Sequence, residues 1–254
     1  MTIAGLFYDS FISTTKLVGG WHRHNEFGIL AAMIDSILAP RANVLGSDDE
    51  RTMAWLHVQP GIQRIPCAKV AIFQRRNFLA PALCAALVQA IDGRRRPSTI
   101  SDSDGDATFR TSETCDFGPD DALAHGVDRQ IADFLGIDPA YGEPLQCQRY
   151  AVGQEFKAHT DYFEPLGIDY EKYCRVAGQR TWTAMIYLNK PGAGGATRFK
   201  AVDKIFQPET GKLLLWNNRR PDGTPNPSTI HQGMKVRVGT KYILTKWFRE
   251  QAWG

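Results

Sequence analysis

A histidine and an aspartate two positions apart could bind a metal ion together. His159 and Asp161 stand in the stretch Phe156-Lys-Ala-His-Thr-Asp-Tyr-Phe163. Side chains two positions apart on an extended strand point to the same face, so both can reach one ion. An imidazole and a carboxylate are two of the three ligands in the two-histidine, one-carboxylate arrangement that binds non-haem Fe(II). Alone the pair is a weak signal, because it often occurs by chance.

The third ligand must come from a distant part of the chain. His231 is the one histidine that follows His159 in the sequence, and it is our candidate. Lys241 comes further along, where an apolar stretch begins. It is either a solvated edge residue or a partner for the distal carboxylate of a bound 2-oxo acid. The remaining histidines lack a ligand partner at suitable spacing, and we expect them to be surface or core residues: His22, His24, His57 and His125.

The composition describes a globular chain. Hydrophobic residues make up 43%, charged residues 22%, and the formal net charge is +3. These values exclude a disordered or fibrous protein, and the charge is too small to indicate a nucleic-acid partner or a membrane surface. The apolar stretches at 27–34 and 80–88 are too short to cross a bilayer. We therefore expect neither kind of partner, whereas the oligomeric state stays open.

The cysteines and the N-terminus indicate a reducing compartment. The five cysteines are odd in number and scattered, without a Cys-x-x-Cys pair, so neither a disulfide framework nor a thiolate zinc site is expected. The first residues contain no basic segment ahead of an apolar core, and hence no secretory signal is expected. Together these features favour free thiols and a cytoplasmic location.

Helical patterns dominate the first half of the chain. Residues 1–66 are expected to form an N-terminal helical extension, with helical spacing of apolar residues over 27–38 and a polar loop at 46–51. Two further helices are predicted, from Pro81 to Gly93 and from Pro119 to Gly136. They precede the segment that holds the candidate ligands.

Short β segments follow from about residue 145. They are rich in β-branched and aromatic residues, are separated by turn residues, and lie at 145–150, 181–188, 212–216, 236–238 and 242–248. The expected fold class is mainly β with flanking helices. Many short strands with frequent turns favour a sandwich or barrel over βαβ units.

The chain contains several short sequence stretches, each once, in an order that is typical of one enzyme family. They are Phe109–Ser112, Gln148–Phe163, Gly178–Asn189, Gly194–Phe199, Gly211–Asn217 and Pro227–Gly233, followed by Lys241 and Thr245–Trp247. Over roughly residues 67–248 the chain resembles the prolyl 4-hydroxylase class of Fe(II)/2-oxoglutarate-dependent dioxygenases. The resemblance implies a dioxygenase domain at 67–254 with a double-stranded β-helix (jelly roll) core.

The resemblance also implies roles for individual residues. His159, Asp161 and His231 would bind Fe(II). Lys241 would bind the distal carboxylate of the co-substrate 2-oxoglutarate, with the hydroxyls of Tyr150 and Thr183 beside it. Arg180 and Trp247 resemble residues that face the substrate. Molecular oxygen completes the set of reactants, and ascorbate is a candidate reductant.

The implied reaction is hydroxylation of an unactivated C–H bond with release of succinate and CO2. The carboxylate of Asp161 favours hydroxylation over halogenation, which needs a small residue there. Peptidyl proline is the favoured substrate, although Phe156 stands where prolyl hydroxylases usually have a tyrosine. The missing hydroxyl removes a hydrogen bond worth about 0.5–1.5 kcal/mol. The loop at 164–177 is long and mixed in charge, which makes it a candidate lid over the substrate, and the sequence leaves that role open.

Other functions remain open at this point. The alternative is the same mechanism acting on a free amino acid or small metabolite. A nucleic-acid repair oxygenase is disfavoured, because such enzymes use an arginine where this chain has Lys241. A non-catalytic metal-binding sensor is the remote alternative, and the presence of all three candidate ligands speaks against it.

Overall fold

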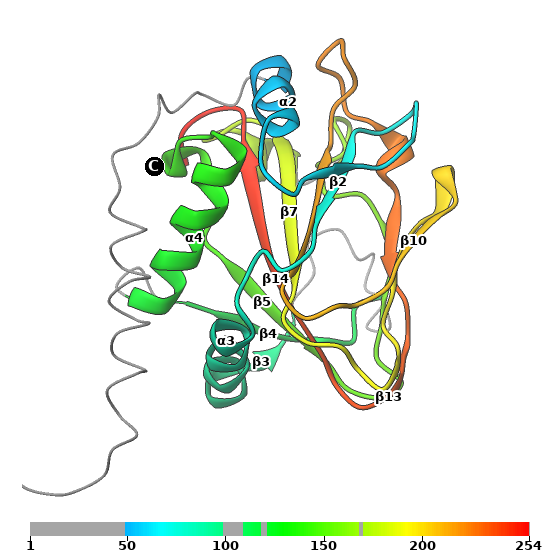
Figure 1. The fold of residues 1–254 in the computed structure, drawn as a ribbon. Helices are drawn as coiled ribbons and strands as arrows, with labels where there is room; N and C mark the ends of the chain where they lie inside the picture. The colour runs from blue at the N-terminus through cyan, green and yellow to red at the C-terminus, as the bar shows by residue number, and fades with distance from the viewer. Residues whose placement is uncertain (1–48, 99–108, 118–120, 168–169, 254) are drawn as a thin grey trace, which may run out of the picture. The chain divides into compact units, whose positions relative to one another are not determined.

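The computed structural model describes residues 49–98, 109–117, 121–167 and 170–253 (Figure 1). The helix expected over 27–38 and most of the expected extension at 1–66 lie outside the described residues, so they stay predictions. None of the described helices is long and apolar enough to cross a membrane.

The largest element is an eight-stranded antiparallel sheet. Neighbouring strands are hydrogen-bonded in the spatial order β1 (Gln63–Arg64), β2 (Ile72–Arg75), β11 (Lys212–Asn217), β7 (Arg180–Tyr187), β14 (Lys241–Arg249), β5 (Gln146–Tyr150), β4 (Glu113–Asp116) and β3 (Arg96–Pro97). The strands that were expected from the sequence, β5, β7, β11 and β14, occupy its centre.

A smaller sheet contains four antiparallel strands, in the order β10 (Lys204–Phe206), β9 (Thr197–Phe199), β12 (His231–Gly233) and β6 (Phe156–His159). A short pair joins β13 (Val236–Val238) to β8 (Ala193–Gly194). Side chains from both larger sheets meet in one buried cluster, which contains Phe199 and Phe206 of the smaller sheet and Met185 and Trp216 of the larger one. The core is therefore the expected jelly roll, two antiparallel sheets that enclose an apolar interior.

The helices are α2 (Asp49–His57), α3 (Pro81–Arg94), α4 (Ala122–Leu135) and α5 (Tyr170–Cys174), with short 3-10 turns at Pro139–Tyr141, Lys200–Val202 and Pro227–Thr229. The Asp121 side chain caps α4 by accepting hydrogen bonds from the main-chain nitrogens of Leu123 and Ala124, and Gly136 ends it in the left-handed conformation. Pro81 occupies the first turn of α3, where its missing N–H costs nothing. Both predicted helices are confirmed.

Strand alternation separates the two faces of the large sheet. On β7, Trp182, Ala184 and Ile186 belong to the cluster that the helices share, whereas Met185 and Tyr187 belong to the interior between the sheets. Successive side chains of a strand point to opposite faces, so one strand serves both cores. In Figure 1, α3 and α4 lie along one side of the large sheet and β10 and β13 lie on the other.

Helix α2 lies within the expected helical extension, but no helix was predicted at its residues. It begins at Asp49, so the loop expected at 46–51 is wrong for its last residues. Its Leu56 is fully buried in the helix-side core. The two carboxylate oxygens of Asp49 accept hydrogen bonds from Trp182 Nε1 at 3.0 Å and Arg219 Nε at 2.7 Å. This segment of the expected extension therefore packs into the same core as the residues after 67.

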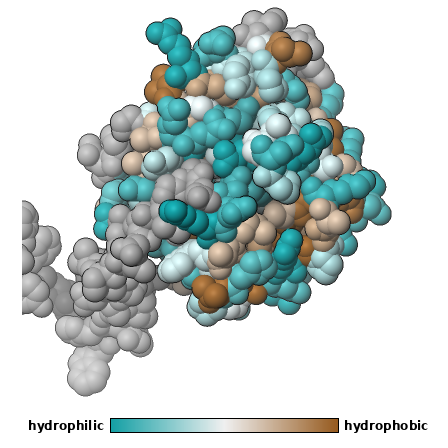
Figure 2. All heavy atoms as spheres, turned by 90° about the horizontal axis from the view of Figure 1, so that it is seen from above, coloured by the Kyte–Doolittle hydropathy of each residue, from teal (hydrophilic) through white to brown (hydrophobic). Residues whose placement is uncertain are grey.

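Polar and apolar residues are mixed on the surface seen from above in Figure 2. Hydrophobic residues are scattered among hydrophilic ones over that face. Such scattering is ordinary for a solvated surface, so the face itself indicates no docking site.

Gly211, just before β11, adopts a backbone conformation that side chains disfavour. Its φ is +74°, and an added Cβ would overlap the main-chain carbonyl oxygen of Leu79. We expect Gly211→Ala to lower the free energy of unfolding by about 3 kcal/mol, because a left-handed backbone costs about 1–2 kcal/mol and overpacking about 1–3 kcal/mol. Gly153→Ala is the matched control, since φ there is +85° and nothing lies within 4 Å of the added carbon. If urea denaturation shows that both variants lose the same free energy of unfolding, the overlap with Leu79 does not destabilise the protein.

Candidate functional site

Two histidines and an aspartate converge between the sheets. His159 ends β6, Asp161 lies in the turn that follows, and His231 begins β12 directly opposite His159 in the strand register. The imidazole centroids of the histidines are 4.4 Å apart, and His159 Nε2 lies 3.8 Å from Asp161 Oδ1. The three candidate ligand atoms lie within 4.8 Å of one another, and in the described part of the chain no other such group of three occurs.

Main-chain carbonyls set the orientation of both imidazoles. His159 Nδ1 lies 2.7 Å from the oxygen of Lys157, and His231 Nδ1 lies 3.0 Å from the oxygen of Thr229. A carbonyl can only accept, so each Nδ1 carries a proton, and in the neutral imidazole the lone pair that a metal needs is then on Nε2. Burial and the nearby His231 lower the pKa of His159 to about 3, which keeps its imidazole neutral.

Asp161 is buried but remains a carboxylate. Burial alone would raise its pKa, yet the two histidines, Arg180 and a hydrogen bond from Thr183 outweigh this and lower it. Two imidazoles and one carboxylate, without a thiolate, fit Fe(II), and three protein ligands leave coordination positions free. The donor set thus matches the metal that the sequence predicted.

Lys241 lies in the same cavity as these three residues. It stands opposite Tyr150 in the pairing of β14 with β5, and its ammonium lies 5.0 Å from the centre of the Tyr150 ring and 5.5 Å from that of Tyr187. The side chain is 1% exposed, and burial lowers its pKa to about 7. Among the described residues, no carboxylate lies within ion-pair distance of this amine. A buried cation without a counter-ion is suited to an anionic ligand.

Thr183 does not stand beside Lys241. It pairs with Trp247 and Trp216 in the strand register, near the other end of β14. Its Oγ1 donates to Asp161 Oδ2 at 2.8 Å, so the structure places it next to a candidate iron ligand instead of the expected co-substrate carboxylate. The sequence could not reveal this, because the position of Thr183 along the cavity depends on strand register.

Thr197 is a cavity residue that the sequence analysis missed. Its Oγ1 accepts a hydrogen bond from Tyr187 at 2.7 Å, and the Tyr187 ring faces the Lys241 ammonium. Thr197 belongs to the stretch Gly194–Phe199, which the sequence analysis quoted for the family resemblance without giving this threonine a role. The smaller sheet thus contributes a hydroxyl, that of Thr197, to the same cavity as the buried amine of Lys241.

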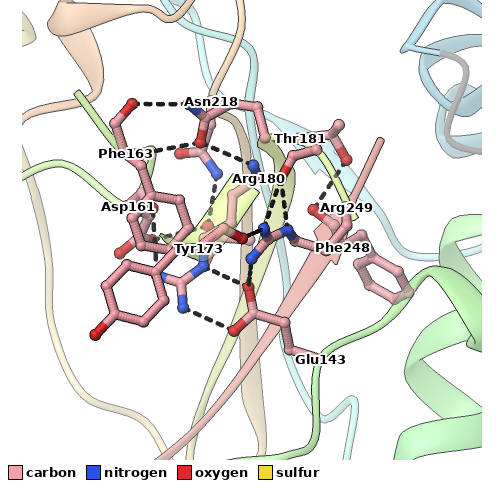
Figure 3. Close-up of polar contacts among 12 residues, drawn as sticks. Glu143, Asp161, Phe163, Tyr173, Arg180, Thr181, Asn218, Phe248 and Arg249 are labelled. Carbon is pink, nitrogen blue, oxygen red and sulfur yellow. Dashed lines mark hydrogen bonds and ion pairs between the residues drawn. The ribbon is translucent and has the colours of Figure 1, made fainter. Parts of the chain in front are cut away.

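Trp247 lines the cavity, and Arg180 stacks on its indole ring at 4.0 Å. Figure 3 shows the Arg180 guanidinium between Asp161 and Glu143. Its Nε and Nη2 donate to the two carboxylate oxygens of Glu143 at 2.6 and 2.7 Å, and its Nη1 donates to the main-chain oxygen of Asp161 at 3.2 Å. Of the two residues expected to face the substrate, Trp247 is thus the one on the cavity wall, whereas Arg180 holds its neighbours in place.

Glu143 was not identified from the sequence, and it joins two buried arginines. Arg249 Nη1 donates to Glu143 Oε1 at 2.8 Å, in addition to the two bonds from Arg180 (Figure 3). Burial would raise the pKa of the Glu143 carboxyl, but the two guanidinium groups outweigh it and lower the pKa. Its contribution to stability is therefore present above the carboxyl pKa of the unfolded chain and is lost as the pH falls towards the lowered value.

Glu143→Ala should strongly destabilise the fold. It leaves two buried guanidinium groups without their carboxylate, which typically costs about 3–5 kcal/mol. Urea denaturation at neutral pH measures the loss, with the exposed Glu50→Ala as the control. If both variants unfold at the same urea concentration, Glu143 does not stabilise this region.

Phe156 and Arg110 form another part of the cavity wall. The Phe156 ring stacks on His159 with centroids 3.6 Å apart, and the Arg110 guanidinium lies 4.9 Å from the Phe156 ring. Arg110 also donates to Ser112 Oγ at 3.1 Å and Gln146 Oε1 at 2.9 Å. The sequence analysis noted the stretch Phe109–Ser112 but gave Arg110 no role. Its guanidinium has no carboxylate partner within ion-pair distance among the described residues.

Part of the candidate lid at 164–177 is anchored. Helix α5 lies within 164–177, the Tyr173 ring stacks on Phe163 at 5.1 Å, and Arg249 donates to the main-chain oxygen of Tyr173. Leu166 is fully exposed. The lid function stays a prediction.

The arrangement agrees with comparisons to known proteins. Residues 145–249 match the model of the 2OG-Fe(II) oxygenase superfamily. The chain is 31% identical over 199 residues to probable prolyl 4-hydroxylase 3 of Arabidopsis thaliana, an alignment that covers 69% of this chain and 68% of that protein. The chain belongs to the prolyl 4-hydroxylase class. Probable prolyl 4-hydroxylase 10 of the same plant is 29% identical over 258 residues, covering 88% of this chain and 85% of that protein.

Solved structures of prolyl hydroxylases share the fold. The viral collagen prolyl hydroxylase of Paramecium Bursaria Chlorella virus-1, in complex with 2OG, has a TM-score of 0.56 at 24% identity, covering 70% of this chain and 95% of that one. A prolyl hydroxylase of Trichoplax adhaerens, in complex with a hypoxia inducible factor peptide, has a TM-score of 0.53 at 13% identity, covering 80% and 90%. At these identities the likeness supports the jelly roll.

Membership of this class settles the type of reaction. The protein is a prolyl hydroxylase-like dioxygenase that depends on Fe(II), 2-oxoglutarate and O2, and not the sensor of the remote alternative. Bound Fe(II) and 2-oxoglutarate supply the activation of oxygen that lets a C–H bond be hydroxylated. The protein contributes ligands, an electrostatic clamp and a shielded cavity.

Proposed function

We propose that His159, Asp161 and His231 hold the Fe(II) and that Lys241 binds the distal carboxylate of 2-oxoglutarate. One observation carries this assignment: the three ligand side chains and an unpaired, buried ammonium line a single cavity. Tyr150 lies beside Lys241, and its phenol has a raised pKa because it is buried, so it remains a hydrogen-bond donor. Thr197 replaces Thr183 as the second hydroxyl of this site.

We propose that the substrate is a proline within a peptide. The relatives at 29–31% identity carry the name prolyl 4-hydroxylase, and the Trichoplax structure holds a peptide. Trp247 offers an indole face on the cavity wall, held by the Arg180 guanidinium. An aromatic wall beside the iron ligands suits a pyrrolidine ring, which is apolar and compact.

A free amino acid or other small carboxylate is the second candidate, and Arg110 favours it. This guanidinium is half-buried in the cavity wall, this partial burial lowers its pKa, and Tyr150 and Asp161 contribute attractions that only partly offset it. A half-buried guanidinium without an ion-pair partner would gain most from a substrate carboxylate. Such a group is present on a free amino acid and absent from the middle of a peptide.

One assay separates these substrates. Purified enzyme with Fe(II) and 2-oxoglutarate is given proline-containing peptides, free proline or other free amino acids, and succinate and the mass of one added oxygen atom are measured. Hydroxylation of an internal peptidyl proline supports the first proposal, and turnover of free amino acids alone supports the second. Arg110→Met should weaken binding of free acids much more than binding of peptides with blocked termini.

We also propose that ascorbate serves as the reductant and that the protein works in the cytoplasm. All five cysteines are free, as a reducing compartment would keep them. The role of ascorbate is tested by adding it to the turnover assay. We expect ascorbate to stimulate turnover and other reductants of equal potential not to do so.

A further inference from the structure

Behind Asp161, two buried residues form a chain of hydrogen bonds. Thr183 Oγ1 lies 2.8 Å from Asp161 Oδ2, and Asn218 Nδ2 lies 2.9 Å from Thr183 Oγ1. Thr183 and Asn218 are both 0% exposed. Solvent therefore cannot replace either bond.

The direction of this chain follows from its acceptor. A carboxylate can only accept, so the single hydroxyl proton of Thr183 is donated to Asp161. The Thr183 oxygen can then only accept a second hydrogen bond, and the donor is the amide nitrogen of Asn218. The amide oxygen of Asn218 is left buried without a hydrogen-bond partner. A lost hydrogen bond of this kind is costly, yet the amide nitrogen still faces Thr183, because only a donor fits at that position.

The main chain holds Asn218 firmly. It follows directly after β11. Its main-chain nitrogen donates to the main-chain oxygen of Thr181 at 2.7 Å, and its main-chain oxygen accepts from the main-chain nitrogen of Asn226 at 2.8 Å. Thr183 is fixed in the centre of the large sheet between β11 and β14. Both donors are thus placed by rigid elements, and Figure 3 shows Asn218 and Asp161 within the same polar network.

The two oxygens of Asp161 consequently differ. Oδ2 is held by Thr183, whereas Oδ1 is the oxygen 3.8 Å from His159 Nε2. We infer that Asn218 and Thr183 are positioning residues that make Asp161 a ligand through Oδ1 alone. This inference rests on the proposed iron site. Ligation by one oxygen keeps a coordination position free that a bidentate carboxylate would occupy.

Metal affinity, measured apart from turnover, tests this role. Co(II) replaces Fe(II) in calorimetric titrations, and its visible absorption reports the coordination. Thr183→Val, which removes only the hydroxyl, should weaken Co(II) binding about 10–100-fold, the usual effect of losing a residue that orients a ligand. Asn218→Asp, which cannot donate as a carboxylate, should weaken it similarly at a pH where the new side chain is ionised. Thr183→Ser should restore wild-type affinity.

Thr181→Val is the matched control, since Thr181 is a buried threonine on the same strand whose hydroxyl donates to the main-chain oxygen of Phe248. Wild-type Co(II) affinity and spectrum in folded Thr183→Val and Asn218→Asp would overturn the inference. So would a higher KM for 2-oxoglutarate with unchanged metal affinity, because that result would make Thr183 a co-substrate residue. If Thr183→Val does not fold, Asn218→Asp decides alone.

Asp161→Ala separates this inference from the proposed function. If that variant binds Co(II) as the wild type does, the iron site itself is wrong. If it loses Co(II) binding while Thr183→Val and Asn218→Asp keep it, the iron site stands and the positioning chain is wrong.

Discussion

His231→Ala is expected to lose Fe(II) binding and turnover while the fold remains. The residue supplies one of three proposed ligands, and even residues that only orient a ligand change metal affinity about 10–100-fold. We therefore expect the metal affinity to fall by more than about 100-fold. The small residue leaves the sheets intact, because His231 stands on a strand whose backbone pairing with β6 and β9 does not depend on its side chain.

Calorimetric titration with Fe(II) or Co(II) and a succinate assay measure the two losses, and circular dichroism reports the fold. His125→Ala is the matched control, because that histidine is exposed on α4. Full activity in folded His231→Ala would refute the metal assignment.

Lys241→Met is expected to raise the KM for 2-oxoglutarate by at least about 30-fold without loss of iron. Removing one partner of a buried charge pair costs about 2–5 kcal/mol, and each 1.4 kcal/mol corresponds to a factor of ten. Methionine keeps most of the volume of the lysine chain, so the cavity wall survives. The exposed Lys190→Ala serves as the control. An unchanged KM would remove Lys241 from the co-substrate site.

The same lysine predicts a pH dependence. Because burial lowers its pKa to about 7, the free enzyme carries the ammonium below pH 7 and loses it above. A dicarboxylate binds the charged form, so the apparent affinity for 2-oxoglutarate should fall about tenfold per pH unit above 7 and level off below it. Lys241→Met should show no such slope. A slope that persists in the variant would assign the titration to another group.

Helix and strand positions followed closely from local patterns. Pro81 at the start of α3, Asp121 and Gly136 at the ends of α4, and the β-branched runs of β7 and β14 are signals that neighbouring residues carry. The short strands of the smaller sheet have no such pattern. They are stabilised by partners distant in the sequence, as β12 is by β6 and β9, so a local pattern could not reveal them.

The sequence by itself indicated the reaction chemistry, through the order of stretches that resembles one enzyme family and through the types of the candidate ligands. His159, Asp161 and His231 are chemically specific groups, and their types limit the metal to a few candidates wherever the chain brings them together. For Lys241 the sequence left two interpretations, a solvated edge residue or a partner for a carboxylate, and the burial of its side chain in the structure favours the second.

Only the tertiary structure decided which hydroxyl lies next to Asp161 and which lies near Lys241. Thr183 and Thr197 are equivalent in sequence terms, yet strand register places one behind Asp161 and the other near Lys241. Arg180 and Glu143 likewise became a buried pair only through the packing of distant segments. Hydrogen bonds depend on distances of a few tenths of an ångström, and those distances are set by the pairing of strands that lie far apart in the chain.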